Sequence, residues 1–386
     1  MTMTKLEERV AGASDVRHAV EALLPTIARR AGEIEQVRQL PPDLFEALRA
    51  TGCFALQLPP SHGGSGAPLP DVLSLVEAVS RADASTGWTV AIGAGSWIDL
   101  IELPRETFDS VIGDARGIVA GAFRPSGTAT LVDDGYEVSG RWAFASNCVY
   151  ADRLFGNTFE PSAGPPGLRT VVFERDQVEI EDTWRVLGMR GTASHHFRAD
   201  HVIVPVERTC VPLSGHACVE TPYGHIPPPS MFALEIVTVA LGAARGAIDD
   251  VLDVADRVPM LEQEALSTNR HFQHRLAEAD TALRAARSLV WECAGELWEL
   301  AEGGSSPSIE LVARTRAAAA WSAGTAVDTV TTAYRLAGGS ALYDESPLQR
   351  RLRDVNTIAQ HFLVKPDTLT TAGRVLSGQE PGIPIF

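Results

Sequence analysis

The sequence predicts an α+β protein made of a helical domain, a β domain and a C-terminal four-helix bundle. Apolar residues recur at three- and four-residue intervals through residues 16–48, as they do in helices that bury one face. Near Gly117 the pattern changes to β-branched and aromatic residues that alternate with small polar ones. From Met231 onward, long stretches rich in Ala and Leu favour a bundle. The predicted domain limits are 1–116, 117–228 and 229–386.

Turn-forming residues separate the predicted elements of each domain. Pro41 stands where a helix can begin, and residues 57–66 form a loop rich in Pro, Gly and Ser. Further helices of the first domain are expected at 68–82, 85–100 and 105–112. Ser-Gly and Asp-Gly turns divide the strands of the β domain, which ends near Pro228. Each bundle helix carries Ala and Leu at helical spacing, and the last long one ends at a glycine.

Size and composition exclude several classes of protein. With 386 residues, 45% of them hydrophobic and 21% charged, the chain has the composition of a globular protein that can bury a cofactor. A formal charge of −16 argues against a nucleic-acid partner, since phosphate binding requires Lys and Arg. No uninterrupted apolar run approaches the roughly 18 residues of a membrane span, and the N-terminus has no apolar signal segment. We expect a cytoplasmic protein that has no membrane partner.

The sequence carries no motif for a nicotinamide or metal site. Its five cysteines are scattered without a CxxC pair, so neither a zinc site nor a disulfide framework is encoded. The glycine-rich phrases HGGSGAP and GMRGTAS do not follow a strand and open a helix, as a GxGxxG phosphate loop must. On pattern alone, both phrases are turns rather than phosphate-binding loops.

Four phrases between residues 57 and 361 carry a resemblance to a known family. They are QLPPSHGGSGAPLPDVLSLVEAVSRADASTGW, RWAFASNCVYADRLFGN, TWRVLGMRGTASHHFRADHVIVP and AYRLAGGSALYDESPLQRRLRDVNTIAQH. In this order they resemble the acyl-CoA dehydrogenase superfamily. The resemblance implies the acyl-CoA dehydrogenase fold, with flavin held between the β domain and the bundle of a homotetramer.

The C-terminal phrase RLRDVNTIAQHFLVKPD is similar to one branch of that superfamily, the flavin-dependent two-component monooxygenases that include oxygenases like p-hydroxyphenylacetate hydroxylase. True dehydrogenases commonly have an R-D-x segment followed by an E-G-T-like stretch. In the monooxygenases a histidine in this context faces the flavin, which implies that His361 is a catalytic proton donor or polarising group. Without that context, a helical histidine is more often a packing residue.

This resemblance implies a two-component enzyme. A separate NAD(P)H:flavin reductase would supply reduced FMN or FAD, which would react with O2 to form a C4a-hydroperoxyflavin that is kept dry until a substrate arrives. The expected reaction is hydroxylation or N-oxygenation of a small organic molecule. The missing nicotinamide fold fits this arrangement, and it fits a dehydrogenase equally well.

The resemblance also assigns contacts to the flavin ring. In the strand phrase RWAFASNCV it implies contacts from Trp142, Phe144 and Ser146, and Ser146 is the second catalytic candidate. In GMRGTAS it implicates Thr192 and Ser194. A buried tryptophan on an amphipathic strand and a plain hairpin turn are the alternative interpretations of these two phrases.

For the flavin phosphates, the family uses the start of the second bundle helix and a Gly-Gly turn from a neighbouring subunit. In this chain the corresponding residues are Arg270 and Gln273 in the helix, and Gly338 and Gly339 in the turn. A surface arginine and the end of a helix are the alternative interpretations.

The candidate substrate contacts are Trp88, Gly95, Ser96 and Glu235. Phenol hydroxylases of the family carry a histidine in the third N-terminal helix, but the matching stretch AIGAGSWIDL has Gly95 and Ser96, so that base is missing. Glu235 leaves an alternative function open, an FAD-dependent acyl-CoA dehydrogenase in which a carboxylate of raised pKa is the base. A second alternative is a non-catalytic binding member of the fold.

Overall fold

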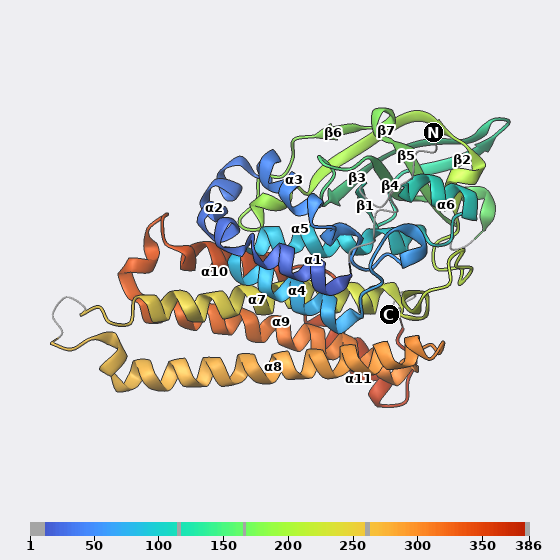
Figure 1. The fold of residues 1–386 in the computed structure, drawn as a ribbon. Helices are drawn as coiled ribbons and strands as arrows, with labels where there is room; N and C mark the ends of the chain where they lie inside the picture. Colours follow the sequence, from blue (N-terminus) through green and yellow to red (C-terminus); the bar gives the residue numbers. More distant parts are fainter. Residues whose placement is uncertain (1–11, 114–116, 165–166, 259–262, 383–386) are drawn as a thin grey trace, which may run out of the picture.

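The three parts of the chain pack together in the computed structural model, which describes residues 12–113, 117–164, 167–258 and 263–382. The predicted domain limits at 1, 116 and 386 lie outside these ranges. Figure 1 shows the sheet on one side of the molecule and the long C-terminal helices on the other, with the N-terminal helices between and beside them. The predicted α+β class and order of parts are confirmed.

The described residues of the N-terminal part form six α-helices: α1 (Ala13–Glu21), α2 (Leu24–Val37), α3 (Pro42–Ala50), α4 (Leu69–Ala82), α5 (Ala84–Gly95) and α6 (Arg105–Ile112). Asp83 starts α5 by accepting a hydrogen bond from Thr86 N at 2.8 Å, which satisfies an otherwise free amide of the first turn. The single helix predicted at 85–100 is divided, because α5 ends at Gly95 and a tighter 3₁₀ helix, η3 (Ser96–Leu100), follows it.

In the part of the chain that the structure describes, the central part is an eight-stranded mixed sheet. Its strands are β1 (Val119–Ala122), β2 (Thr128–Val132), β3 (Gly135–Ala145), β4 (Arg153–Phe159), β5 (Leu168–Glu174), β6 (Glu179–Glu181), β7 (His195–Val204) and β8 (Thr209–Cys210). The order is β6-β7-β3-β2-β4-β5-β8, and β1 pairs in parallel with β4. Strand β3 lies between β2 and the antiparallel β7, so its end and the segment before β7 are neighbours.

The pairing of β3 with β7 is irregular at its last residues. Trp142 lies opposite Phe197, but the register shifts before Ala145 pairs with His195. Phe144 therefore has a left-handed φ of 65° and is 62% exposed, whereas Trp142 is 0% exposed. The indole of Trp142 stacks on Phe197 with ring centroids 5.0 Å apart, and its Nε1 donates to Asn157 O at 2.8 Å. The expectation that Trp142 contacts flavin is wrong, because the sheet core covers the whole side chain.

The C-terminal part contains the long helices α7 (Pro228–Asp253), α8 (Arg270–Glu302) and α9 (Ile309–Ala337), followed by α10 (Pro347–Ile358) and α11 (Asp367–Leu376). Helix α7 packs against α9 on one side and against α4 and α5 on another, so it joins the bundle to the N-terminal helices. In the described residues, α7 is the one helix long and apolar enough to cross a membrane, and 89% of its most apolar window is buried by its neighbours.

The two aromatic residues of β3 are expected to respond differently to mutation. Trp142→Phe removes a buried hydrogen bond and leaves a void, so it should lower the free energy of unfolding by about 2 kcal/mol. Phe144→Ala removes an exposed ring and should change that free energy by less than about 0.5 kcal/mol. Urea unfolding measures both effects. Equal destabilisation by the two variants would contradict these assignments.

Candidate functional site

Three segments that are far apart in the sequence meet where the helical domain, the sheet and the bundle join. Trp88 of α5 donates from its indole Nε1 to Ser146 Oγ, just after β3, at 2.9 Å. The same indole ring makes an edge contact with the imidazole of His361, just after α10, with ring centroids 5.7 Å apart. The structure therefore brings together three of the predicted residues. Ser146 is buried, whereas Trp88 and His361 are partly exposed.

A chain of hydroxyl groups continues from Ser146 into the sheet. Ser146 Oγ lies 2.8 Å from Ser194 Oγ, which lies 2.7 Å from Thr192 Oγ1. Thr192 Oγ1 in turn lies 2.9 Å from the carbonyl oxygen of Met189. We call this series, from the Trp88 indole to the Met189 carbonyl, the hydroxyl chain. It joins the three predicted hydroxyl residues into one hydrogen-bonded unit.

The direction of every hydrogen bond in the hydroxyl chain follows from its two ends. Each hydroxyl has one proton, and a carbonyl only accepts, so Thr192 must donate to Met189 and accept from Ser194. Ser194 then accepts from Ser146, and Ser146 accepts from Trp88. Any other arrangement leaves Thr192 and Met189 oxygen lone pairs facing each other at 2.9 Å. The remaining hydrogen-bonding capacity of Ser146 and Ser194 is therefore one lone pair each.

The loop that carries Thr192 and Ser194 has an unusual backbone. Met189 (φ 56°) and Ala193 (φ 46°) are both left-handed, a conformation that residues with a side chain rarely adopt. Contacts on the flanking segment hold it in place: Asn147 N donates to Thr192 O at 3.3 Å, and Cys148 Sγ donates to Ala193 O at 3.4 Å. The plain hairpin turn considered for GMRGTAS is therefore not what the structure has. A short 3₁₀ helix, η6 (Arg190–Thr192), follows Met189.

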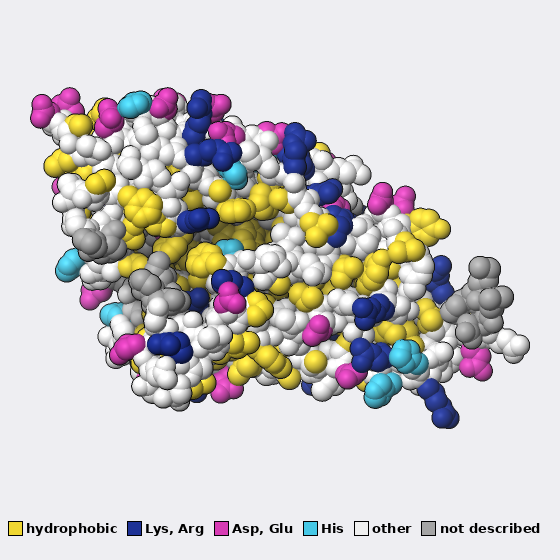
Figure 2. All heavy atoms as spheres, turned by 180° about the vertical axis from the view of Figure 1, so that it is seen from behind, with side chains coloured by type: hydrophobic (Ala, Val, Ile, Leu, Met, Phe, Trp, Pro, Cys, Tyr) yellow, Lys and Arg dark blue, Asp and Glu magenta, His cyan; other side chains and the backbone are white. Residues whose placement is uncertain are grey.

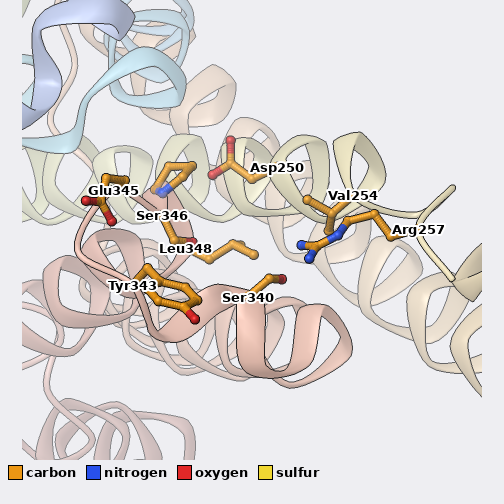
Figure 3. A pocket seen from close by; sticks show the side chains of 9 residues that line it. Asp250, Val254, Arg257, Ser340, Tyr343, Glu345, Ser346 and Leu348 are labelled. Atoms are coloured by element: carbon orange, nitrogen blue, oxygen red, sulfur yellow. The ribbon is translucent and has the colours of Figure 1, made fainter. Parts of the chain in front are cut away.

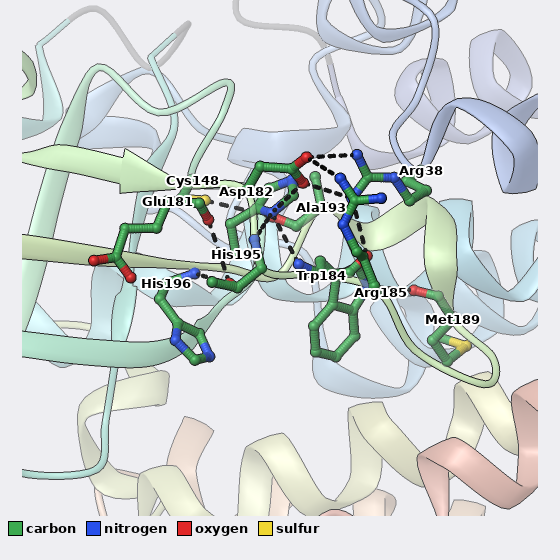
Figure 4. A network of polar contacts seen from close by, with 11 residues as sticks. Arg38, Cys148, Glu181, Asp182, Trp184, Arg185, Met189, Ala193, His195 and His196 are labelled. Carbon is green, nitrogen blue, oxygen red and sulfur yellow. Dashed lines mark hydrogen bonds and ion pairs between the residues drawn. The ribbon is translucent and has the colours of Figure 1, made fainter.

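An ion pair ties the same loop to the N-terminal helices (Figure 4). Arg38, the left-handed residue after α2, binds both carboxylate oxygens of Asp182 at 2.5 and 2.9 Å and donates to Trp184 O at 3.3 Å. Hydrogen bonding from Arg38 lowers the pKa of Asp182 to about 2. The ring of His195 accepts at Nδ1 from the amides of residues 183 and 184, so its proton is on Nε2. Burial lowers the pKa of His195, which keeps this ring neutral.

An aromatic surface adjoins the hydroxyl chain. The exposed ring of Phe144 makes edge contacts with Trp184 and His196, at centroid distances of 6.2 and 6.1 Å. His196 Nδ1 is buried and has no hydrogen-bond partner in the described residues. Figure 2 shows a hollow between the two halves of the molecule in which hydrophobic side chains gather, with histidine and arginine side chains among them. A flat aromatic ligand with polar edges fits such a surface.

His361 is a neutral hydrogen-bond donor in this structure. Its Nδ1 accepts from Leu363 N at 3.3 Å, so the proton is on Nε2. Burial, with a further contribution from the Arg316 charge, lowers the pKa of His361 to about 4. Arg316 of α9 is itself buried, and burial lowers its pKa to about 10. Sequence reasoning missed Arg316 because one arginine in an alanine-rich helix has no distinguishing motif.

Glu235 and Gly95 are explained by the packing of α5 against α7. A Cβ at Gly95 would lie 3.0 Å from Phe232 Cε1 and 3.2 Å from Glu235 Oε2, so this position has little room for a side chain. Glu235 is fully buried and accepts a hydrogen bond from Gln57 Nε2. Burial raises the pKa of Glu235 to about 8, so this carboxyl group is mainly protonated at pH 7. Ser96, the first residue of η3, donates from its hydroxyl group to Ile92 O of α5 at 2.6 Å.

The residues predicted to bind phosphate lie at one end of the bundle, because α8 begins where the antiparallel α9 ends (Figure 1). Arg270 is exposed at the start of α8, and Gln273 Nε2 donates to Ser267 O at 2.9 Å. Gly338 (φ 63°) and Gly339 follow α9, and nothing lies within 4 Å of an added Cβ at either glycine. Beside this turn is a cavity of about 400 Å³ (Figure 3), lined by Asp250, Val254, Arg257, Ser340, Tyr343, Glu345, Ser346, Pro347 and Leu348.

Comparisons with known proteins give the same family as the fold. Residues 11–102 match the acyl-CoA dehydrogenase N-terminal domain, and residues 234–366 match an acyl-CoA dehydrogenase C-terminal domain. The indole-3-acetate monooxygenase of Pseudomonas putida is 30% identical over 94% of each chain. The oxygenase component of an FADH2-dependent resorcinol hydroxylase from Rhizobium sp. is 30% identical over 98% of this chain and 95% of its own.

Solved structures agree with these matches. The crystal structure of 3-HSA hydroxylase from Rhodococcus sp. RHA1 superposes with a TM-score of 0.87, at 28% identity, over 95% of this chain and 97% of that one. The chain therefore belongs to the acyl-CoA dehydrogenase superfamily and, within it, to the flavin-dependent monooxygenases. The predicted function, an oxygenase component of a two-component flavin-dependent monooxygenase, is confirmed at this level.

The lowered pKa of His361 predicts a pH effect on stability. The unfolded histidine takes up a proton near pH 6.5 and the folded one only near pH 4, so stability is present above pH 6.5 and is lost as the pH falls toward 4. His361→Asn removes this contribution. Between pH 6.5 and 4, the wild type should therefore lose more stability than the variant. The slope of the unfolding free energy against pH should differ between the two proteins by an amount that corresponds to the uptake of up to about one proton on unfolding.

Chemical unfolding at several pH values checks this prediction. The raised pKa values of buried acids such as Glu235 act in the opposite direction, but they are common to both proteins and cancel in the difference. Parallel stability curves for the wild type and His361→Asn would show that His361 titrates normally in the folded state.

Proposed function

We propose that this enzyme accepts reduced FMN or FAD from a separate NAD(P)H:flavin reductase and oxygenates a small aromatic substrate in the hollow between the β domain and the bundle. The observation that carries the proposal is the direction of the hydroxyl chain, which leaves only lone pairs on Ser146 and Ser194. A reduced flavin ring has an N–H group in its central ring where the oxidised ring has a lone pair. Hydroxyl groups that only accept favour the reduced form.

The residues at the site fit a flavin ring. Phe144 offers an exposed apolar face, Ser146 and Ser194 offer acceptors, and His361 offers an Nε2–H donor. Bound reduced flavin supplies two electrons to O2, so that one oxygen atom enters the substrate and the other leaves as water. Neutral side chains at this position cost less to keep away from water than charged ones, which favours a dry site.

His361 is the proposed hydrogen-bond and proton donor at the site, where it would face oxygen chemistry supplied by bound reduced flavin. A neutral imidazole with its proton on Nε2 stabilises developing negative charge by hydrogen bonding, without carrying a charge that would attract water. The indole ring of Trp88 makes an edge contact with this imidazole, and the indole Nε1–H donates a hydrogen bond to Ser146 Oγ. One indole therefore places the proposed donor and the proposed acceptor relative to each other.

The substrate that we propose is aromatic and largely apolar. Phe123 and Phe362 stack with centroids 6.5 Å apart and nearly parallel rings, and Phe362 also contacts His361 at 4.8 Å. Such rings bind another aromatic ring through its faces and edges. The relatives named for indole-3-acetate and resorcinol make these two compounds the first to test. The histidine that would deprotonate a phenol is replaced by Gly95, so indole-3-acetate, which is not a phenol, is favoured over resorcinol.

We also propose a cytoplasmic homotetramer. In the described residues all five cysteines are free, and four of them are buried, which suits a reducing compartment. Exposed apolar side chains on the bundle favour subunit contacts through its helices. They include Leu252, Leu300, Trp321, Leu342 and Leu376. FADH2 is the first reduced flavin to test, because one relative is named for it.

Replacing His361 tests the proposed reaction. In His361→Ala, the fraction of consumed O2 that appears in product should fall at least about tenfold, because a positioned donor is lost. The dissociation constant for reduced flavin should change by less than about threefold, since the acceptors on Ser146 and Ser194 remain. Oxygen consumption and product are measured together with an excess of a flavin reductase. Unchanged coupling would remove His361 from the mechanism.

Glu235→Gln distinguishes the oxygenase from a dehydrogenase. Glutamine keeps the shape of the protonated carboxyl that the structure has at neutral pH, so oxygenation should retain at least about half of its rate. A dehydrogenase that used this carboxylate as its base would lose activity on an acyl-CoA by at least about a hundredfold. The two assays are run on the same preparation, and only one of the two patterns agrees with the proposal.

A further inference from the structure

A carboxyl group of the bundle contacts the loop that ends the hydroxyl chain. Asp354 of α10 is buried, and its Oδ1 accepts a hydrogen bond from Met189 N at 2.6 Å. The preceding residue, Gly188, lies directly against the α10 backbone: an added Cβ would collide with the carbonyl of Arg353 and lie 2.7 Å from Asp354 N. The loop is therefore pressed onto α10 at the point where Asp354 binds it.

Hydrogen bonds hold the backbone on both sides of the Met189 Cα, in the peptide group before it and in the one after it. The Met189 N–H donates to Asp354, and the Met189 carbonyl accepts from Trp184 Nε1 at 2.9 Å and from Thr192 Oγ1 at 2.9 Å. The left-handed φ of 56° is unfavourable for methionine and persists only where neighbouring groups fix it. Loss of the Asp354 acceptor would leave the buried Met189 N–H without this partner and would release the φ of Met189, on which the direction of the Met189 carbonyl depends.

The direction of the Met189 carbonyl determines the orientation of the protons at the site. Thr192 donates to Met189 because the Met189 carbonyl points at it, and the direction of the Ser194 and Ser146 protons follows from that one bond. We infer that Asp354 is a positioning residue for oxygenation: by holding the Met189 N–H, it fixes the φ of Met189 and with it the direction of the following carbonyl, which makes Ser146 and Ser194 present lone pairs to the flavin ring. This inference rests on the proposed function.

The inference requires an acceptor at position 354 and does not require a charge. Burial raises the pKa of Asp354 to about 7, and its Oδ1 accepts from Met189 in either protonation state. An asparagine side chain offers an acceptor oxygen in the same place. Asp354→Asn should therefore preserve the hydroxyl chain, whereas Asp354→Ala should disorder it.

A second contact of the same loop provides a matched control. Ser85 Oγ of α5 accepts from Gly191 N at 3.2 Å, two residues beyond Met189. This bond is buried and joins the loop to a helix, as the Asp354 bond does, but it involves neither the N–H nor the carbonyl of Met189. Ser85→Ala thus weakens the attachment of the loop without removing an end of the hydroxyl chain.

The experiment is an anaerobic equilibrium titration of each full-length variant with reduced FMN and with oxidised FMN, which yields the ratio of the two dissociation constants. The wild type should bind reduced FMN at least about tenfold more tightly, the value of one favourable hydrogen bond. In Asp354→Ala the dissociation constants for reduced and oxidised FMN should differ by less than about threefold. Asp354→Asn and Ser85→Ala should keep the preference for reduced FMN within about threefold of the wild type.

Thr192→Val tests the same inference by a route that does not depend on the folding of Asp354→Ala. Valine has the shape of threonine and interrupts the hydroxyl chain between Met189 and Ser194, so the redox preference should again be lost. A retained preference in Asp354→Ala or Thr192→Val, or an equal loss in Ser85→Ala, would overturn the inference. A wild type that binds neither form of FMN nor of FAD would instead overturn the proposed function.

Discussion

Hydrogen bonds to the backbone N–H and the backbone carbonyl of Met189 connect the three parts of this molecule. The N–H is bound by Asp354 from the bundle, and the carbonyl is bound by Thr192 and Trp184 from the β domain. The hydroxyl chain then leads from Thr192 to Trp88 in the helical domain. A left-handed methionine costs about 1–2 kcal/mol, and buried hydrogen bonds of about 1 kcal/mol each offset that cost. The site therefore forms only when all three parts are packed.

The side chains at this junction are arranged to be neutral. Burial lowers the pKa of His361 to about 4 and raises that of Glu235 to about 8, so neither carries a charge at pH 7. Hydrogen bonding at a neutral site is directional, and the direction of each proton becomes the main variable that the protein controls. Arg316 is a buried arginine whose charge contributes to the lowered pKa of His361.

The fold could be predicted from the sequence because each of its parts has its own periodicity. The change of pattern near Gly117 and the long alanine-rich helices correspond to β1 and to α7–α9. The site could be predicted only in part. The resemblance selected Ser146, Thr192, Ser194 and His361, which the structure places along one junction, in contact through Trp88 or through one another.

The errors and omissions have a common physical origin. The resemblance assigns both Trp142 and Phe144 to the cofactor, and it does not show which side chain the sheet covers: a register shift before Ala145 exposes Phe144, whereas Trp142 is buried. Asp354 and Gln57 were missed because their partners, Met189 and Glu235, are 165 and 178 residues away in the sequence. Pairing across such separations depends on how the domains pack, and a local pattern does not encode it.

The most direct test is a crystal structure of the protein with reduced flavin, grown and frozen without oxygen. The account predicts that the ring lies against Phe144, with one of its N–H groups within about 3.2 Å of Ser146 Oγ or Ser194 Oγ and with His361 Nε2 facing the ring. A ring bound elsewhere, for example in the cavity beside Ser340, or one that turns only acceptor atoms toward both serines, would contradict it.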